Sequence, residues 1–251
     1  MNALSFESVD GAELEVRAVG CSLGSFRVLD DVSLTMAAGR KHGVIGPNGA
    51  GKSTFFNVLT GVIRDVDGHV RLDGEDVTGR RPDRIVRSGM LRTFQTPRVM
   101  AGWTVVEQVQ FAAEQSGRPR ATTRARARAA LEATGLIDAA HQPCESLNSL
   151  QRRRVALAGC LAHVPRVILL DEPTAGLDDA ETRAFAQLLT EAHQQYGFTV
   201  GLVEHKLSFL MTFCDEVSVL DVGTVIASGT PEQISDDPRV IEAYLGIDEV
   251  A

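Results

Sequence analysis

The sequence has little of what marks secreted or membrane-spanning proteins. Its 251 residues include four scattered cysteines without a C-x-x-C pair, which argues against a disulfide framework and a zinc site. No apolar run approaches the ~20 residues needed to cross a bilayer, and the first ten residues lack the basic and apolar stretches of a signal peptide. The net charge of −8 disfavours general nucleic-acid binding. We therefore expect reduced thiols in the cytosol, and any membrane role would require a partner.

What is present is the composition of an ordinary globular protein, with 44% hydrophobic and 23% charged residues. Segments 14–19 and 28–36 have the β-branched pattern of strands, and 68–77 resembles one arm of a hairpin. A further buried strand is predicted at 91–95. Later in the chain, predicted strands alternate with helices in the order 166–171, 180–195, 198–204, 206–213 and 216–221. This alternation predicts right-handed crossovers and a mostly parallel sheet.

The stretch from about 97 to 163 has almost no strand pattern. Its apolar residues follow a helical period over 104–115, over 120–135 and in the run that starts at Gln151. We therefore predict a helical subdomain inserted into the sheet, within one domain that spans residues 1–251.

A glycine-rich segment joins a short apolar strand to a helix. The sequence GPNGAGKS at 46–53 matches the phosphate-loop pattern G-x-x-x-x-G-K-[ST] in the strand–loop–helix context that this pattern needs. Glycines let backbone N–H groups converge on phosphate oxygens, Lys52 can reach the β- and γ-phosphates, and the Ser53 hydroxyl can bind Mg²⁺. The alternative is an incidental glycine-rich turn. The residues expected to hold the nucleotide are Gly46, Pro47, Asn48, Gly49, Ala50, Gly51, Lys52, Ser53 and Thr54.

Two carboxylates follow one another in the apolar strand RVILLDEP at 166–173. Asp171 lies at the tip of the predicted strand, where it can hold Mg²⁺ through water, and Glu172 can polarise an attacking water. The alternative is an ordinary buried strand that ends in Asp-Glu-Pro. A glutamate at position 172, rather than glutamine or aspartate, is what hydrolysis would need.

Four motifs, GPNGAGKST, TFQ, VILLDEPTAGLD and VEH, resemble those of the ATP-binding-cassette (ABC) ATPase family in order and spacing. The resemblance covers nearly the whole chain, from LEVRAV to EAYLG. Two longer stretches, MLRTFQTPRVMAGWTVVEQV and GTVIASGTPEQISDDPRVIEAYLG, resemble the ATPases that serve importers of branched-chain amino acids and related amides or urea. The resemblance implies an α/β fold of the P-loop NTPase class and ABC type. Its parts would be a parallel-sheet core, an N-terminal antiparallel β subdomain and the inserted α-helical subdomain, with ATP and Mg²⁺ as cofactors.

The resemblance also implies roles for single residues. Gln95 matches the Q-loop glutamine that touches Mg²⁺ and senses the γ-phosphate, and His205 matches the switch histidine that contacts this phosphate. Asp178 ends the D-loop, AGLD, which crosses to a partner subunit. Residues 96–108, with Trp103, resemble the surface that receives a coupling helix from a membrane subunit. The alternatives are a surface glutamine, a structural histidine and a core tryptophan. The catalytic residues would be Glu172, His205 and Gln95, and the Mg²⁺ ligands Ser53, Gln95 and Asp171.

One motif departs from the family pattern. The family's signature loop, Leu-Ser-Gly-Gly-Gln, binds the γ-phosphate of the ATP held by the other subunit, and this chain has LNSLQ, whose frame is fixed by Gln151. Asn148 can still donate a hydrogen bond and cap the following helix, and Ser149 is a mild change. Leu150 replaces a glycine, which puts an isobutyl group against a phosphate and removes access to positive φ. Because an apolar group strips water from the phosphate without replacing its hydrogen bonds, we expect a cost of about 1–3 kcal/mol in interaction free energy. This cost corresponds to a loss of roughly ten- to hundredfold in rate or binding at that site. The alternative is that Leu150 points away and the loop works normally.

The phosphate loop, the carboxylates and the switch histidine of this chain match the family, so a weak signature loop would impair only the ATP held by a partner. We therefore expect a heterodimer of unequal ATPase subunits that contacts two membrane permease subunits on the cytoplasmic side of the membrane. An extracytoplasmic solute-binding protein would be an indirect partner, and nucleic acid would not be one. The expected function is ATP hydrolysis that powers the import of branched-chain amino acids or related amides and urea. The alternatives are a slow-turnover regulatory nucleotide-binding subunit and the ATPase of an exporter.

Overall fold

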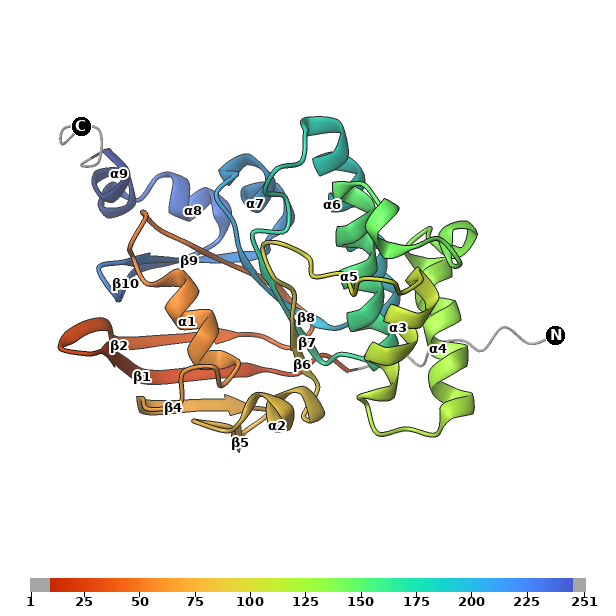
Figure 1. Cartoon of the computed structure of the whole chain (residues 1–251). Coiled ribbons are helices and arrows are strands. Elements are labelled where there is room, and N and C mark those ends of the chain that lie inside the picture. Colours follow the sequence, from red (N-terminus) through yellow and green to blue (C-terminus); the bar gives the residue numbers. More distant parts are fainter. Residues whose placement is uncertain (1–9, 246–251) are drawn as a thin grey trace.

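The computed structural model, which describes residues 10–245, has a six-stranded sheet at its centre (Figure 1). The strand order is β10-β9-β3-β8-β7-β6. Five of these strands run parallel: β3 (Lys41–Ile45), β6 (Met90–Arg92), β7 (Val167–Asp171), β8 (Thr199–Val203) and β9 (Glu216–Asp221). At one edge, β10 (Thr224–Gly229) pairs antiparallel with β9. The residues of β7 and β8 are all buried, as expected for parallel strands that are covered on both faces.

A smaller antiparallel sheet lies against one face of the central sheet. Its order is β2-β1-β4-β5, from the strands β1 (Leu14–Leu23), β2 (Phe26–Met36), β4 (Asp67–Leu72) and β5 (Glu75–Asp76). One apolar cluster joins this sheet to the helix α1 (Lys52–Leu59), through Phe55 and Phe56, and to β7. The helix that follows β3 is therefore held between the two sheets.

The inserted part of the chain is helical. It contains α3 (Val105–Glu114), α4 (Arg120–Ala133) and α5 (Ser149–His163), with the short 3₁₀ turns η1 (Ile137–Ala139) and η2 (Cys144–Ser146). Figure 1 shows these helices grouped at the end of the molecule opposite the tip of the β1–β2 hairpin. Thr104 begins α3 with a capping box, because its side chain accepts from Glu107 N while the Glu107 carboxylate accepts from Thr104 N.

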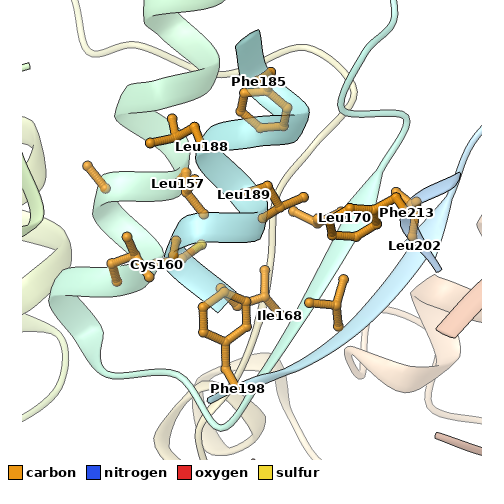
Figure 2. Packing of buried hydrophobic residues seen from close by; sticks show 14 of the residues in the cluster. Leu157, Cys160, Ile168, Leu170, Phe185, Leu188, Leu189, Phe198, Leu202 and Phe213 are labelled. Carbon is orange, nitrogen blue, oxygen red and sulfur yellow. The ribbon is translucent and has the colours of Figure 1, made fainter. Parts of the chain in front are cut away.

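The other face of the central sheet is covered by α5 and α6 (Asp179–Tyr196). Figure 2 shows Leu157 and Cys160 of α5 beside Leu188 and Leu189 of α6, with Ile168 and other strand side chains nearby. The remaining helices are α2 (Pro82–Arg87), α7 (Leu207–Phe213), α8 (Pro231–Ser235) and α9 (Pro238–Leu245). In residues 10–245, no helix is long and apolar enough to cross a membrane.

The predicted fold class is confirmed, but two predicted strands are wrong in extent. The strand predicted at 91–95 is β6, which ends at Arg92. The hairpin arm predicted at 68–77 is divided by a turn in which Asp73 and Gly74 have φ of 48° and 77°, so that β4 and β5 pair with each other. The strand β10 and the helices α2, α8 and α9 had no counterpart in the sequence analysis. The signal-peptide expectation falls mainly on residues 1–9, outside the described residues.

The parallel order of the strands brings the predicted site together. Since β3, β6, β7 and β8 run the same way, their carboxyl ends meet at one edge of the sheet, where ligands bind in sheets of this kind. The residues that follow these strands contain the phosphate loop, Gln95, Glu172 and His205, respectively.

Candidate active site

The phosphate loop connects β3 to α1 and depends on glycine at two points. Gly46 has a φ of 151°, and a Cβ there would lie 1.9 Å from the carbonyl oxygen of Leu220. Gly51 is the N-cap of α1 with a φ of 102°, and no side chain of the described residues caps this helix. The first N–H groups of α1 are therefore left for an anion, as in other phosphate-binding helix starts.

Lys52 lies against its own loop. Its ammonium donates hydrogen bonds to the carbonyl oxygens of Gly46 at 2.6 Å and Pro47 at 2.8 Å. The side chain is buried, and this burial lowers the pKa of the ammonium, while the Glu172 carboxylate acts in the opposite direction. The loop forms part of the wall of an open groove of about 360 Å³. The residues that line this groove are Val28, Asn48, Gly49, Ala50, Gly51, Lys52, Ser53, Thr54, Glu172 and His205. The groove thus joins most of the predicted phosphate ligands to two of the predicted catalytic residues.

Glu172 is held from two sides. Its Oε1 lies 2.9 Å from Nε2 of His205, which follows β8, and its Oε2 accepts a hydrogen bond from Nε2 of Gln95 at 2.5 Å. The backbone of Glu172 has a φ of 46°, in the left-handed region that non-glycine residues seldom adopt. Such strain is often found at functional sites, where the surrounding structure maintains it. The structure therefore brings two of the predicted catalytic residues, Gln95 and His205, into contact with the third, Glu172.

Asp171, the predicted magnesium ligand, is paired with an arginine. The carboxylate Oδ2 accepts from Nη2 of Arg92 at 2.5 Å, and the side chains of both residues are nearly buried, with 11% and 9% exposed. Ser53, another predicted ligand, lines the groove beside the phosphate loop. The sequence analysis gave no role to Arg92, although an arginine in a strand pattern is a signal, since a buried charge needs a partner.

The signature loop begins helix α5 with an intact cap. Asn148 Oδ1 accepts from Gln151 N at 2.8 Å, and Gln151 Oε1 accepts from Asn148 N at 3.0 Å, which confirms the predicted cap. Ser149 is the first residue of the helix. Leu150 follows with its side chain partly buried against the main apolar cluster, and it is not among the residues with positive φ.

These observations correct part of the expectation for Leu150. A positive φ is not needed at this position in the structure, because the signature loop runs directly into the first turn of α5. The expected loss of access to positive φ therefore has no consequence for this conformation. Whether the side chain weakens a partner's ATP site stays a prediction.

The D-loop is fixed by two buried charged residues that the sequence analysis did not single out. Arg153 of α5 donates to the carbonyl oxygens of Ala175, Gln95 and Glu172, the last two at 3.2 and 3.5 Å. Glu204, just before the switch histidine, accepts from Thr174 N at 2.8 Å and from its hydroxyl. Arg153 of α5 therefore holds the first residue of the D-loop, and Glu204, which follows β8, holds Thr174 just before it.

Asp178, the last D-loop residue, caps the next helix. Its Oδ1 accepts from Glu181 N at 2.8 Å, and the Glu181 carboxylate accepts from Asp178 N at 3.2 Å, a capping box at the start of α6. The structure thus gives Asp178 a clear local role in addition to the cross-subunit role predicted for it.

Comparison with known proteins gives the family. The sequence profile of the ABC transporter family matches residues 29–175, more than half of the chain. The chain belongs to this family. A second profile, of the branched-chain amino acid ATP-binding cassette transporters, matches residues 224–250, which contain the tail that carried the predicted resemblance.

Individual ABC proteins resemble the chain over almost its full length. BraF of Pseudomonas aeruginosa, a high-affinity branched-chain amino acid transport ATP-binding protein, is 37% identical over 248 residues, covering 93% of this chain and 97% of BraF. LivG of Escherichia coli, with the same description, is 35% identical over 248 residues, with 93% and 97% covered. The solved structure of an ABC transporter cassette in its ADP conformation has a TM-score of 0.84 and 28% identity, covering 94% of this chain and 99% of that one. A nucleotide-free ABC transporter cassette also has a TM-score of 0.84, with 26% identity and coverage of 93% and 98%.

These matches confirm the predicted family, fold class and enzyme class. The chain is an ATP-binding ABC subunit, an ATPase coupled to transport.

Proposed function

We propose that the chain is the ATP-hydrolysing subunit of an importer of branched-chain amino acids or related amides and urea. Support for the cargo comes from BraF and LivG, whose names specify branched-chain amino acid transport, and from the tail profile. These relatives favour import over the two alternatives, an exporter ATPase and a regulatory subunit. A complete set of hydrolytic side chains also argues against a purely regulatory subunit.

The contacts of Glu172 carry the catalytic part of the proposal. Its carboxylate lines the groove of the phosphate loop, and each of its two oxygens has a contact with a neighbouring site residue, Gln95 or His205. A carboxylate held in this way can accept the proton of a water that attacks the γ-phosphate. His205, which is about half exposed and lines the same groove, can then contact the phosphate. Lys52 would leave its two loop carbonyls and donate to phosphate oxygens instead.

The donor set fits Mg²⁺. Ser53, Gln95 and Asp171 supply hydroxyl, amide and carboxylate oxygens, and Mg²⁺ bound to a nucleotide needs only one or two protein ligands in addition to phosphate and water. The described residues contain no group of three or more His, Cys, Asp or Glu that would form a metal cage by itself. Bound at this position, Mg²⁺ would neutralise charge on the phosphates.

We also propose the assembly. Two permease subunits would contact the surface that includes residues 96–108, on the cytoplasmic side of the membrane, and a solute-binding protein would act through them. An open groove of about 370 Å³ supports this contact, lined by Gly102, Trp103, Glu107, Gln110, Phe111 and Glu114. The rings of Trp103 and Phe111 meet edge to face at 5.4 Å, and Phe111 is 42% exposed. A second ATPase subunit with an intact signature loop would complete the dimer.

Two measurements test this function. The purified chain, alone and with its partner ATPase, should hydrolyse ATP in the presence of Mg²⁺, and Glu172→Gln should abolish this activity without preventing ATP binding. Cells that lack the chain should regain uptake of radiolabelled leucine when they receive the wild-type chain, but not when they receive Glu172→Gln. Restored ATPase activity without any uptake of a branched-chain amino acid, amide or urea would contradict the proposed cargo.

A further inference from the structure

Arg92 joins three elements of the nucleotide site. It is the last residue of β6, and its Nη2 donates to Asp171 at the end of β7 at 2.5 Å. Its Nη1 donates to Asn57 Oδ1 of α1 at 2.7 Å and lies 3.4 Å from Oγ1 of Thr60, the C-cap residue of α1. One guanidinium thus connects the strand before Gln95, the predicted metal ligand and the helix that begins at the phosphate loop.

The guanidinium also lies over two aromatic rings. Its central carbon lies 5.7 Å from the centre of the Phe56 ring and 5.6 Å from that of Phe94. At these distances both rings attract the guanidinium through cation–π interactions. Since only 9% of the Arg92 side chain and 11% of the Asp171 side chain are exposed, solvent screens this pair much less than it screens a surface pair.

The partner of Arg92 is the carboxylate that the nucleotide site needs for Mg²⁺. A cation already bonded to Asp171 cancels most of its attraction for a second cation. It also adds a positive charge to a site that must accept a strongly negative triphosphate. Arg92 is therefore placed to weaken the binding of the metal and to strengthen the binding of the nucleotide.

We propose that Arg92 is a positioning residue that acts as the built-in counter-ion of Asp171 and sets how strongly nucleotide binding depends on Mg²⁺. This inference rests on the proposed function. Through Asn57, Arg92 also holds the carboxylate at a fixed place relative to α1 and so to the phosphate loop. If Arg92 had a purely structural role, it would hold the same three elements together. Its loss would then change nucleotide affinity equally with and without Mg²⁺.

The test is the affinity for a fluorescent ATP analogue in EDTA and across a Mg²⁺ titration. In Arg92→Met the uncompensated carboxylate should weaken binding in EDTA by about tenfold, the effect of one unit charge in a partly buried site. The Mg²⁺ concentration at half-saturation should fall by a similar factor, because Asp171 is then free to attract the metal. Arg92→Lys keeps the charge and should stay within about threefold of wild type in both buffers. Arg128→Met, which removes an exposed arginine of α4, is the matched control and should change neither value.

A double variant shows whether the effect of Arg92→Met comes from the unpaired carboxylate or from a folding defect. Arg92→Met combined with Asp171→Asn leaves no unpaired carboxylate, so it should fold and bind the analogue in EDTA within about twofold of wild type, but respond little to Mg²⁺. Equal weakening of Arg92→Met in both buffers, no change in either, or loss of EDTA binding in the double variant would each overturn the inference. A wild-type chain that binds no nucleotide in either buffer would instead contradict the proposed function.

Discussion

The Nε2 atom of His205 lies 2.9 Å from Oε1 of Glu172, although the two residues follow different strands. The other carboxylate oxygen, Oε2, accepts a hydrogen bond from Gln95 at 2.5 Å. The carboxylate is therefore oriented by two side chains of the chain itself. Contacts of this kind reduce the reorganisation needed in the reaction, which is one way that active sites accelerate chemistry.

Glu172→Gln should lower kcat by at least about a hundredfold, because the amide has the shape of the carboxylate but cannot accept the proton of the attacking water. ATP affinity should change by less than about threefold, since the phosphate loop is untouched. Steady-state ATPase assays and equilibrium nucleotide binding measure the two effects. Glu132→Gln, on the exposed face of α4, is the control and should keep full activity. Turnover at the wild-type rate in Glu172→Gln would show that another group is the base.

Lys52→Met should lower the affinity for ATP but leave the free energy of unfolding almost unchanged. Removing the ammonium deletes charge-assisted hydrogen bonds to phosphate, each worth about 1.5–3 kcal/mol, so affinity for ATP should fall roughly 10- to 150-fold. The free energy of unfolding should stay within about 1 kcal/mol of wild type, because burial lowers the pKa of this ammonium and its removal relieves that desolvation cost. Nucleotide titration and urea unfolding give the two numbers. A large loss of stability with unchanged affinity would assign Lys52 a structural role only.

Two substitutions at Leu150 test the asymmetric dimer. If the isobutyl group hinders a partner's ATP, Leu150→Ala and Leu150→Gly should both raise the ATPase rate of a homodimer, by up to about a hundredfold. Leu150→Gly should be the less stable of the two by about 1 kcal/mol, since glycine is unfavourable in the first turn of α5. Both should be less stable than wild type because Leu150 packs on the main apolar cluster. Brisk hydrolysis by the unmodified chain, with no gain in either variant, would contradict this prediction.

The sequence predicted best where chemistry demands particular residues close together in the chain. The phosphate loop, the Asp171–Glu172 pair and the Asn148 cap all depend on residues within a few positions of one another, so local spacing was enough. The Arg92–Asp171 pair could not be found in this way, because 79 positions separate its members. Only the parallel pairing of β6 with β7 places them side by side. For the same reason the sequence could suggest that Leu150 was unusual but not where its side chain packs.

The strand β10 had no counterpart among the predicted strands, although a glycine marks the turn before it. Val222 and Gly223, with φ of 42° and 79°, form the turn of a hairpin between β9 and β10. The sequence TVIASG after this turn does not alternate apolar and polar residues, so its pattern does not predict a strand. The hairpin matters to the site, because the Leu220 carbonyl is the atom that excludes a side chain at Gly46.

A buried histidine at the start of β3 makes stability depend on pH. His42 of β3 is 2% exposed, its Nε2 lies 2.9 Å from Ser218 Oγ, and burial lowers its pKa from 6.5 to about 4. Glu216 lies 3.7 Å from its Nδ1 and would favour the proton, but this carboxylate is 49% exposed and therefore screened by water. Desolvation is the larger effect, so His42 is neutral in the folded protein at pH 7.

Between pH 6.5 and about 4 the unfolded chain binds a proton at His42 that the folded chain does not, so the free energy of unfolding should fall as pH falls through this range. The full loss is about 3 kcal/mol, from roughly 2.5 pKa units at 1.36 kcal/mol each. His42→Gln stays neutral and is long enough to keep a hydrogen bond to Ser218, so it should remove this contribution while all other titrating groups are retained. Urea unfolding of both proteins at pH 7.5 and pH 4.5 gives the comparison. Parallel stability profiles for wild type and His42→Gln would mean that His42 is protonated in the folded state, with Glu216 as its counter-ion.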